Sequence, residues 1–176
     1  MVRLSDNQKE GLSSHMIKKF KQLEPTDRKT IDNMVGFIKQ GKRFNTARDE
    51  AVKLSKPKTY VPKGLSKKDE KAQIKSIVEK TDRPKLKSFT SKKSNWVEKF
   101  EAKYKVKITN KSWIDTNIIK TKGQTEIIDK GMGAYYSSGS RPNQTPFSWG
   151  YGRLASVIMG GPARRLDKKI WDKYKK

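Results

Sequence analysis

Three features of the sequence predict a mainly α-helical protein. Apolar residues recur at steps of three and four in several segments, residues that cap helices precede those segments, and glycine or proline follows them. Only 32% of the residues are hydrophobic and the mean hydropathy is -0.95, so the apolar side chains suffice for one small core. We therefore expect a basic N-terminal arm of helices and extended linkers over residues 1–84. A compact helical domain with an aromatic core is expected over 85–165, and a basic tail over 166–176.

The first half of the arm contains two predicted helices. One begins at Pro25 and Thr26 and ends at Gly41, and its apolar stripe consists of Ile31, Met34, Val35 and Ile38. The next begins at Thr46, which is placed to cap the segment ARDEAVKLS. The helix ends where Lys56 precedes Pro57, because the residue before a proline disfavours helical backbone.

An extended linker and a third helix complete the arm. The linker is predicted over residues 56–64, KPKTYVPKG, which contain two prolines. The third helix begins at Ser66 and presents a narrow apolar stripe of Ile74, Ile77 and Val78. Because so thin a stripe does not hold an isolated helix, we expect this helix to pack on another element.

The helical domain begins after the basic loop RPKLKSFTSKKS. A core helix is predicted by the spacing of Trp96, Val97, Phe100 and Tyr104. The alternation in KVKIT predicts a short strand through Val106 and Ile108. Next, GQTEIIDKG predicts one or two helical turns between glycines.

A final helix is predicted from Thr145, its cap, and Pro146 to the Gly160-Gly161-Pro162 stop. At 100 degrees per residue its inner face carries Phe147, Tyr151, Leu154, Ala155 and Ile158. Trp149, Arg153 and Ser156 share the opposite face, where Trp149 and Arg153 are spaced to stack. A helix with these two faces is suited to packing on both sides.

The charge of the chain favours an anionic partner. The formal net charge is +24, and 33 of the 42 basic residues are lysine. Lysine carries a hydrated point charge, whereas the planar guanidinium of arginine forms paired hydrogen bonds with specific groups. The high ratio of lysine to arginine therefore favours diffuse attraction to polyphosphate, an anionic lipid surface or acidic protein faces. The chain has no cysteine, which excludes disulfides and thiolate metal sites. It also has no evident signal peptide and no apolar run of the roughly 20 residues that span a bilayer.

Residues 131–162, here called the neutral segment, contrast with the rest of the chain. Arg141 and Arg153 are its only charged residues. Two interpretations are open: Arg141 and nearby backbone N–H groups bind a phosphate or carboxylate, or the loop is hydrogen-bonded within its own chain. The candidate interface residues in and after this segment are Tyr136, Ser138, Ser140, Arg141, Asn143, Gln144, Trp149, Arg153, Arg164, Arg165 and Trp171.

Catalysis is the function class that the sequence supports least. His15 is the only histidine, and it lies in a predicted helix far in sequence from the neutral segment. Asp115, Glu126 and Asp129 lack the spacing of a cation-binding loop, and no phosphate-binding loop motif occurs. We expect no enzyme activity, no metal, no cofactor and no small-molecule substrate.

A resemblance covers about residues 85–167. The segments KSNWVEKFEAKYKVKIT and KGQTEIIDKGMGAYYSSGSRPNQTPFSWGYGRLASVIMGGPARRLD resemble an uncharacterised family found in large DNA viruses of algae and in tailed phages. Within them, the run SSGSRPNQTPFSW carries most of the specificity. The resemblance implies a virion protein, such as a minor capsid protein of a large icosahedral virus, and it supplies no catalytic residues.

The expected function combines this resemblance with the charge. We expect a minor capsid or cement protein, located in the virion at the inner face of the capsid. Its basic arms would bind neighbouring capsid proteins, and its lysines an anionic membrane or the genome. The alternative is a nucleic-acid-binding protein that packages DNA without sequence preference. No sequence motif of a specific nucleic-acid reader is visible.

Overall fold

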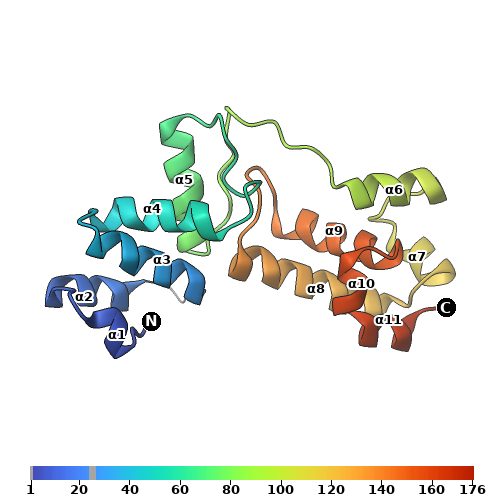
Figure 1. Cartoon of the computed structure of the whole chain (residues 1–176). Helices are drawn as coiled ribbons and strands as arrows, with labels where there is room; N and C mark the ends of the chain where they lie inside the picture. Colours follow the sequence, from blue (N-terminus) through green and yellow to red (C-terminus); the bar gives the residue numbers. More distant parts are fainter. Residues whose placement is uncertain (1, 24–26) are drawn as a thin grey trace. The chain divides into compact units, whose positions relative to one another are not determined.

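The computed structural model describes residues 2–23 and 27–176, and it is mainly α-helical, as the sequence predicts (Figure 1). The chain divides into two compact units. The first unit comprises Met1–Phe89 and Gly139–Asn143, and the second comprises Thr90–Ser138 and Gln144–Lys176. The helices of the first unit are α1 (Asp6–Lys9), α2 (Ser14–Gln22), α3 (Arg28–Lys39), α4 (Phe44–Ser55) and α5 (Lys67–Val78). Those of the second are α6 (Asn95–Tyr104), α7 (Lys111–Asn117), α8 (Thr121–Ser138), α9 (Pro146–Ile158), α10 (Pro162–Leu166) and α11 (Lys168–Tyr174).

The first unit has a hydrophobic core of its own. Phe20 of α2 is completely buried, and its ring meets that of Phe44 edge-on, with the centroids 5.2 Å apart. The stripe of α3 predicted from the sequence is confirmed, because Ile31, Met34 and Val35 are buried in the same cluster. The N-terminal arm is therefore a set of helices that share apolar contacts.

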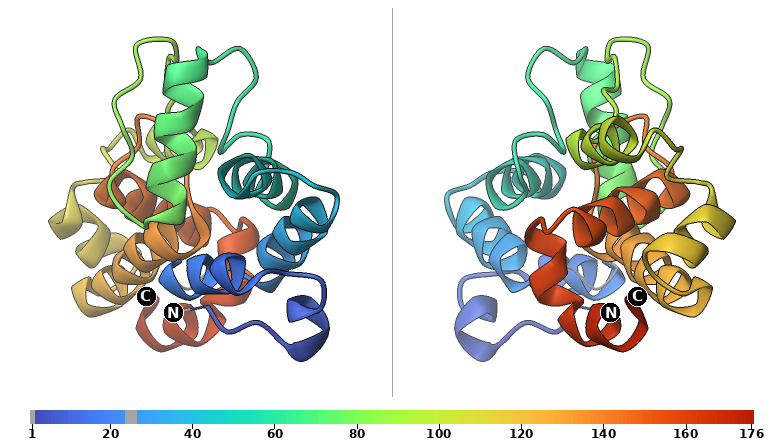
Figure 2. Two further views of the ribbon diagram at one scale, coloured as in Figure 1. Left: turned by 90° about the vertical axis from the view of Figure 1, so that its left-hand side faces the viewer. Right: turned by 90° about the vertical axis from the view of Figure 1, so that its right-hand side faces the viewer.

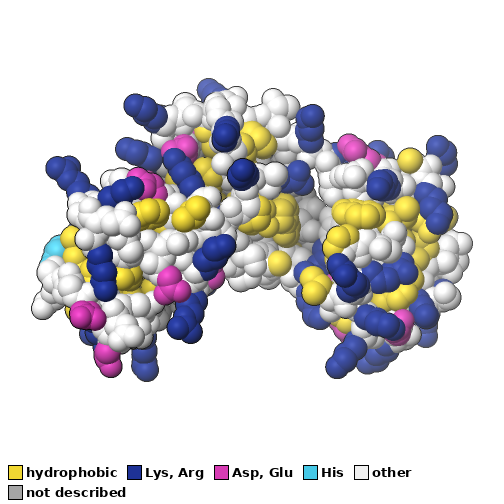
Figure 3. All heavy atoms as spheres, viewed as in Figure 1, with side chains coloured by type: hydrophobic (Ala, Val, Ile, Leu, Met, Phe, Trp, Pro, Cys, Tyr) yellow, Lys and Arg dark blue, Asp and Glu magenta, His cyan; other side chains and the backbone are white. Residues whose placement is uncertain are grey.

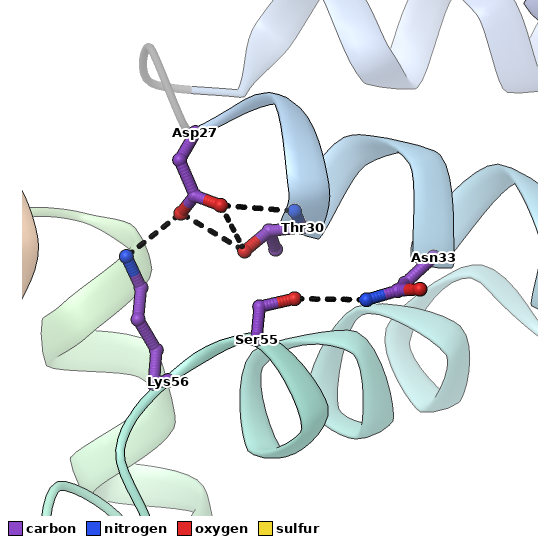
Figure 4. A network of polar contacts seen from close by, with 5 residues as sticks. All are labelled: Asp27, Thr30, Asn33, Ser55 and Lys56. Atoms are coloured by element: carbon purple, nitrogen blue, oxygen red, sulfur yellow. Dashed lines mark hydrogen bonds and ion pairs between the residues drawn. The ribbon is translucent and has the colours of Figure 1, made fainter.

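A polar network ties the start of α3 to the end of α4 (Figure 4). Asp27 caps α3 by accepting hydrogen bonds from the backbone N–H and the hydroxyl of Thr30, both at 3.0 Å, and it pairs with Lys56 at 2.7 Å. Asn33 donates to the hydroxyl of Ser55 at 3.0 Å. The predicted helix start at Pro25 and Thr26 lies outside the described residues.

Helix α4 begins earlier than the sequence predicts. The predicted cap, Thr46, lies inside the helix, which starts at Phe44 with Arg43 as its N-cap. The reason is tertiary packing. Burial of Phe44 against Phe20 stabilises a helix that begins two residues before the local capping signal at Thr46.

Helix α5 begins after Ser66, as predicted, and the Ser66 hydroxyl accepts a hydrogen bond from the N–H of Asp69 at 3.1 Å. Its stripe, Ile74, Ile77 and Val78, is buried with Val52 of α4. Residues 56–64 do not behave as a free linker, because the half-buried side chain of Tyr60 packs against this cluster. The expectation that α5 needs a packing partner is therefore confirmed.

The second unit is built around α6, α8 and α9. Phe100 of α6, Ile127 of α8 and Leu154 of α9 are completely buried, and α8 and α9 lie side by side (Figures 1 and 2). Most of the expected C-terminal tail, 166–176, is part of this unit as helix α11. Ile170 and Tyr174 of α11 enter the core, which is why the basic C-terminal residues adopt a fixed helical structure.

Two local predictions in the second unit are wrong. Residues 105–110 form a bend and a single turn in place of the predicted strand, and Ile108 is buried without a partner strand among the described residues. The predicted one or two turns at GQTEIIDKG are part of α8, an 18-residue helix that continues through Gly123, Gly131 and Gly133. The glycines at positions 123 and 131 have a packing role instead. Without a side chain there, neighbouring elements can approach the helix closely.

Helix α9 follows the prediction closely at its start. Thr145 accepts a hydrogen bond from the N–H of Ser148, the Ser148 hydroxyl reaches back to the N–H of Thr145, and Pro146 is the first helical residue. Leu154, Ala155 and Ile158 are buried as predicted, whereas Phe147 is 61% exposed. Phe147 lies in the first turn of α9. Within the described residues, no helix is both long and apolar enough to cross a membrane.

Candidate functional site

The neutral segment begins where α8 and α9 cross at very short range. A Cβ added to Gly131 would lie 2.6 Å from the Cα of Gly150, and one added to Gly150 would lie 2.8 Å from the carbonyl oxygen of Ile128. Real Cβ contacts are not this short, so the two backbones approach each other only because both positions are glycine. Close packing of α8 on α9 therefore requires glycine at both positions of this crossing.

Asp167 and Arg153 form the most deeply buried ion pair of the second unit. The Asp167 side chain is fully buried and accepts hydrogen bonds from Arg153 Nε at 2.6 Å and from Arg153 Nη2 at 2.9 Å. Lys130 of α8 approaches the same carboxylate at 3.4 Å. Such a two-pronged pair fixes geometry, and here it joins α9 to the junction of α10 and α11.

Arg164 and Trp171 form a second polar cluster at the end of α9. The Arg164 guanidinium lies 4.0 Å from the centre of the Trp171 ring. It donates from Nε to the carbonyl of Val157 at 2.6 Å and from Nη2 to that of Ile158 at 2.7 Å. Arg164 therefore donates to the last two carbonyls of α9 and places a positive charge at the negative end of the helix dipole.

The loop Gly139–Asn143 belongs to the first unit, where its polar groups meet α5 and the segment after it. Ser140 is fully buried: its carbonyl accepts from Gln73 Nε2 at 3.0 Å, and its hydroxyl accepts from Arg83 Nε at 3.1 Å. Asn143 accepts from the N–H of Leu86 at 2.6 Å and donates to the carbonyls of Leu86 and Phe89 at 3.1 and 2.6 Å. These contacts match the interpretation in which the loop is hydrogen-bonded within its own chain.

Tyr60 lies next to two arginines of the first unit. Burial raises the pKa of the Tyr60 phenol, and the charges of Arg141 and Arg83 only partly offset that effect. The Arg83 side chain is 5% exposed and also donates to the carbonyls of Ser76 at 2.7 Å and Thr81 at 2.5 Å. This cluster holds the turn after α5 against the loop that contains Ser140.

The remaining polar candidates lie at the end of α8 and the start of α9. Gln144 donates to the hydroxyl of Ser91 at 2.5 Å, and its carbonyl accepts from the hydroxyl of the buried Tyr135 at 3.1 Å. The ring of Tyr136 meets that of Tyr135 edge-on at 4.9 Å. Ser138 is exposed at the last residue of α8.

The candidate residues do not form a single site. Ser140, Arg141 and Asn143 belong to the first unit, and the other candidates belong to the second. Within the second unit, Arg153 is bound to Asp167 and Arg164 to Trp171, while Trp149 is half-buried and Arg165 is exposed. His15 is exposed in α2. Among residues 2–23 and 27–176, no group of three or more His, Cys, Asp or Glu side chains is arranged to hold a metal ion.

Sequence reasoning missed the buried partners of the candidates. Asp167, Arg83 and Gln73 are not among the candidates predicted from the sequence, yet each is buried and bonds to the neutral segment. One signal was available for Asp167, because it is one of only two acidic residues after residue 130. No local pattern distinguished Gln73 or Arg83 from their neighbours.

The basic surface is the other feature that could act on a partner (Figure 3). All 33 lysines lie in the described part of the chain, and none of them is buried. Several described carboxylates are already engaged; examples are Asp69 with Ser88, Asp115 with Thr121, and Glu126 with Tyr174. Hydrogen bonds from Thr121 lower the pKa of Asp115, and the hydrogen bond from Ser88 lowers that of Asp69. The surface therefore carries a large excess of positive charge, because 42 basic residues outnumber 18 acidic ones and no lysine is buried.

Comparison with known proteins gives one match. A family model described as "Family of unknown function (DUF5824)" matches residues 57–170, which extend from the segment before α5 into α11. No curated protein and no solved structure matches the chain. The matched region contains the α8–α9 crossing, the Arg153–Asp167 pair and the Gly139–Asn143 loop. Because the match covers more than half of the 176 residues, the chain belongs to this family of unknown function.

Proposed function

We propose that the chain is a structural component of a virus particle, a minor capsid or cement protein that binds neighbouring capsid proteins through its basic surface. The resemblance of residues 85–167 to proteins of large algal viruses and tailed phages supports the viral assignment. The observation that carries the binding role is that the positive charges are exposed, whereas the most deeply buried negative charge is paired within the chain. The lysines are all exposed or half-exposed, whereas the best-buried carboxylate, Asp167, is neutralised by Arg153.

The internal contacts of the neutral segment also support a structural role. Gly131 and Gly150 let α8 and α9 touch, and Ser140 and Asn143 bond to residues of the first unit. The segment is therefore free of lysine because it must pack within its own chain. The surface left for a partner is cationic, and acidic faces of neighbouring subunits complement it.

The direct test is to locate the chain in purified particles of the virus that encodes it. Lysine-reactive cross-linking followed by mass spectrometry should join its exposed lysines to capsid proteins, with the same links after nuclease treatment. Lys67, Lys71 and Lys169 are suitable reporters because each is exposed. Absence of the chain from purified particles would refute the proposal.

Binding to nucleic acid without sequence preference is a second candidate, favoured by the lysine excess. A lysine surface that neutralises about six phosphates loses roughly 10³-fold in affinity between about 50 and 200 mM salt, because condensed counterions are released. Fluorescence anisotropy with two unrelated DNA duplexes would measure this slope. We expect equal affinities for both duplexes and loss of binding near 0.5 M salt.

A pair of charge-reversal variants makes this second test sharper. Lys67→Glu with Lys71→Glu alters exposed α5 positions, and Lys169→Glu with Lys173→Glu alters exposed α11 positions. Diffuse binding predicts that both pairs weaken DNA binding and flatten its salt slope to a similar degree. Binding that persists at high salt would exclude purely electrostatic attraction. Absence of binding at low salt would exclude the nucleic-acid candidate and leave the capsid proposal standing.

A further inference from the structure

We propose that the loop Gly139–Asn143 couples the stability of the two units, so that each unit unfolds locally less often while the other is folded. The loop connects α8 to α9, which both belong to the second unit, yet the loop itself is part of the first unit. The chain therefore leaves the second unit after Ser138 and returns to it at Gln144. This inference does not rest on the proposed function.

The first unit holds the loop by hydrogen bonds near both of its ends. The carbonyl of Ser140 accepts from Gln73 at 3.0 Å, and its hydroxyl accepts from Arg83 at 3.1 Å. Asn143 accepts from the N–H of Leu86 at 2.6 Å and donates to its carbonyl at 3.1 Å. Arg83 and Leu86 are each 5% exposed. Undocking the loop would take these partners away from the first unit and lower its stability.

The backbone of the loop also fits closely against the first unit. Gly139 has a φ of +92°, a conformation that side chains other than glycine rarely adopt. A Cβ added there would lie 3.1 Å from the ring of Tyr60 and 3.4 Å from a methyl group of Ile77. Tyr60 and Ile77 belong to the apolar cluster that buries α5. The loop is therefore packed on that cluster as well as hydrogen-bonded to its surroundings.

The second unit holds the two ends of the loop in place. Ser138 is the last residue of α8, and Gln144, just before α9, accepts from the hydroxyl of Tyr135 and donates to that of Ser91. With both helices folded, the loop starts and ends at fixed positions, so docking it costs little further conformational entropy. When the second unit unfolds, residues 90–138 become a flexible connection, and closing so long a chain costs entropy. Firm docking of the loop therefore requires a folded second unit.

The dependence acts in both directions. Because the docked loop requires both units to be folded, the free energy of docking is lost when either unit unfolds. A substitution that weakens docking should therefore make both units unfold more often, and by the same factor. A substitution that weakens the first unit elsewhere should leave the second unit unaffected. This difference separates a coupling loop from a loop that merely belongs to the first unit.

Amide hydrogen exchange of the full chain, followed by mass spectrometry, tests the proposal, because the slowest amides of each unit report its unfolding equilibrium. Asn143→Gly removes the side chain that bonds to Leu86, and glycine accepts the positive φ of 58° at this position. Exchange should become about tenfold faster in α5 of the first unit, the scale of one or two lost hydrogen bonds. It should become faster by the same factor in α8 and α9 of the second unit.

Two further variants make the test specific. Gln73→Met weakens docking from the side of α5, because Gln73 donates to the carbonyl of Ser140, and it should also speed exchange in α8 and α9. Asn33→Ala is the control, because Asn33 joins α3 to α4 within the first unit by donating to Ser55. It should speed exchange in the first unit alone. Circular dichroism should show equal helix content in all variants.

Three results would overturn the proposal. The first is faster exchange confined to the first unit in both Asn143→Gly and Gln73→Met, because the loop would then contribute nothing to the second unit. The second is exchange in α8 and α9 that Asn33→Ala speeds as much as Asn143→Gly does, because coupling would then not depend on the loop. The third is wild-type exchange throughout Asn143→Gly and Gln73→Met. If Asn143→Gly does not fold, Gln73→Met and Asn33→Ala decide the question between them.

Discussion

Replacement of Gly131 by alanine should separate α8 from α9. The added Cβ would lie 2.6 Å from the Cα of Gly150, 3.2 Å from the backbone nitrogen of Gly150 and 3.2 Å from the Cβ of Arg153. Two of these three atoms belong to backbone, so no side-chain rotation relieves the clash and the helices must move apart. Overpacking of this kind costs about 1–3 kcal/mol or more. In a unit of about 80 residues, each kcal/mol lowers the melting temperature by roughly 4–8 °C.

Gly133→Ala is the matched control for that variant. Gly133 lies two residues further along α8, is exposed, and has no atom within 4 Å of an added Cβ. Alanine there should stabilise the helix by up to about 1 kcal/mol, because alanine has the higher helix propensity. The midpoints of thermal and urea unfolding should therefore fall for Gly131→Ala and rise for Gly133→Ala. If Gly131→Ala is as stable as Gly133→Ala, the close approach of α8 and α9 does not exist.

Three further predictions concern charges and hydrogen bonds. Asp167→Asn should lower the free energy of unfolding of the second unit by about 3 kcal/mol, because it leaves Arg153 beside a buried neutral group. Asp172→Asn, at an exposed residue, should change the free energy of urea unfolding by no more than about 0.5 kcal/mol. Burial opposes ionisation of Asp27, but hydrogen bonds from Lys56 and Thr30 outweigh it and lower the pKa below its ordinary value of 3.8. The ionised Asp27 therefore stabilises the fold fully above pH 3.8, and this stabilisation is lost as the pH falls through the lower pKa of the folded state. The difference in Tm between wild type and Asp27→Asn should then shrink on acidification, and a difference that stays constant would contradict this reasoning. Arg83→Lys should cost about 2 kcal/mol in the first unit, since lysine cannot donate to Ser140, Ser76 and Thr81 together, and a variant that unfolds like wild type would show that these bonds contribute nothing.

Helix starts and apolar stripes were the features most open to prediction. Thr145 followed by Pro146 is a local capping signal, and α9 begins there. Ser66 and the stripe of Ile74, Ile77 and Val78 likewise defined α5. These features are predictable because hydrogen bonds within one helical turn and periodicity along one helix depend only on neighbouring residues.

The misplaced elements have a common cause in packing. Gly123 and Gly131 are predicted to bound one or two helical turns, yet α8 continues through both, and at these positions Tyr174 and Gly150 approach the helix closely. Phe44 begins α4 ahead of the local cap because it packs on Phe20. The candidate residues of the neutral segment were identified by composition, but their partners Asp167, Arg83 and Gln73 lie far away in sequence.

The amino-acid sequence alone determined the helical class, the excess of exposed positive charge and the existence of a charge-free segment, because these follow from composition and local periodicity. Only the tertiary structure decided how that segment is used. It divides the segment between two units, brings two glycine backbones into contact, and assigns Arg153 and Ser140 to partners 14 and 57 residues away. Such pairings are set by the shape of the packed core, and no short-range pattern of residues encodes them.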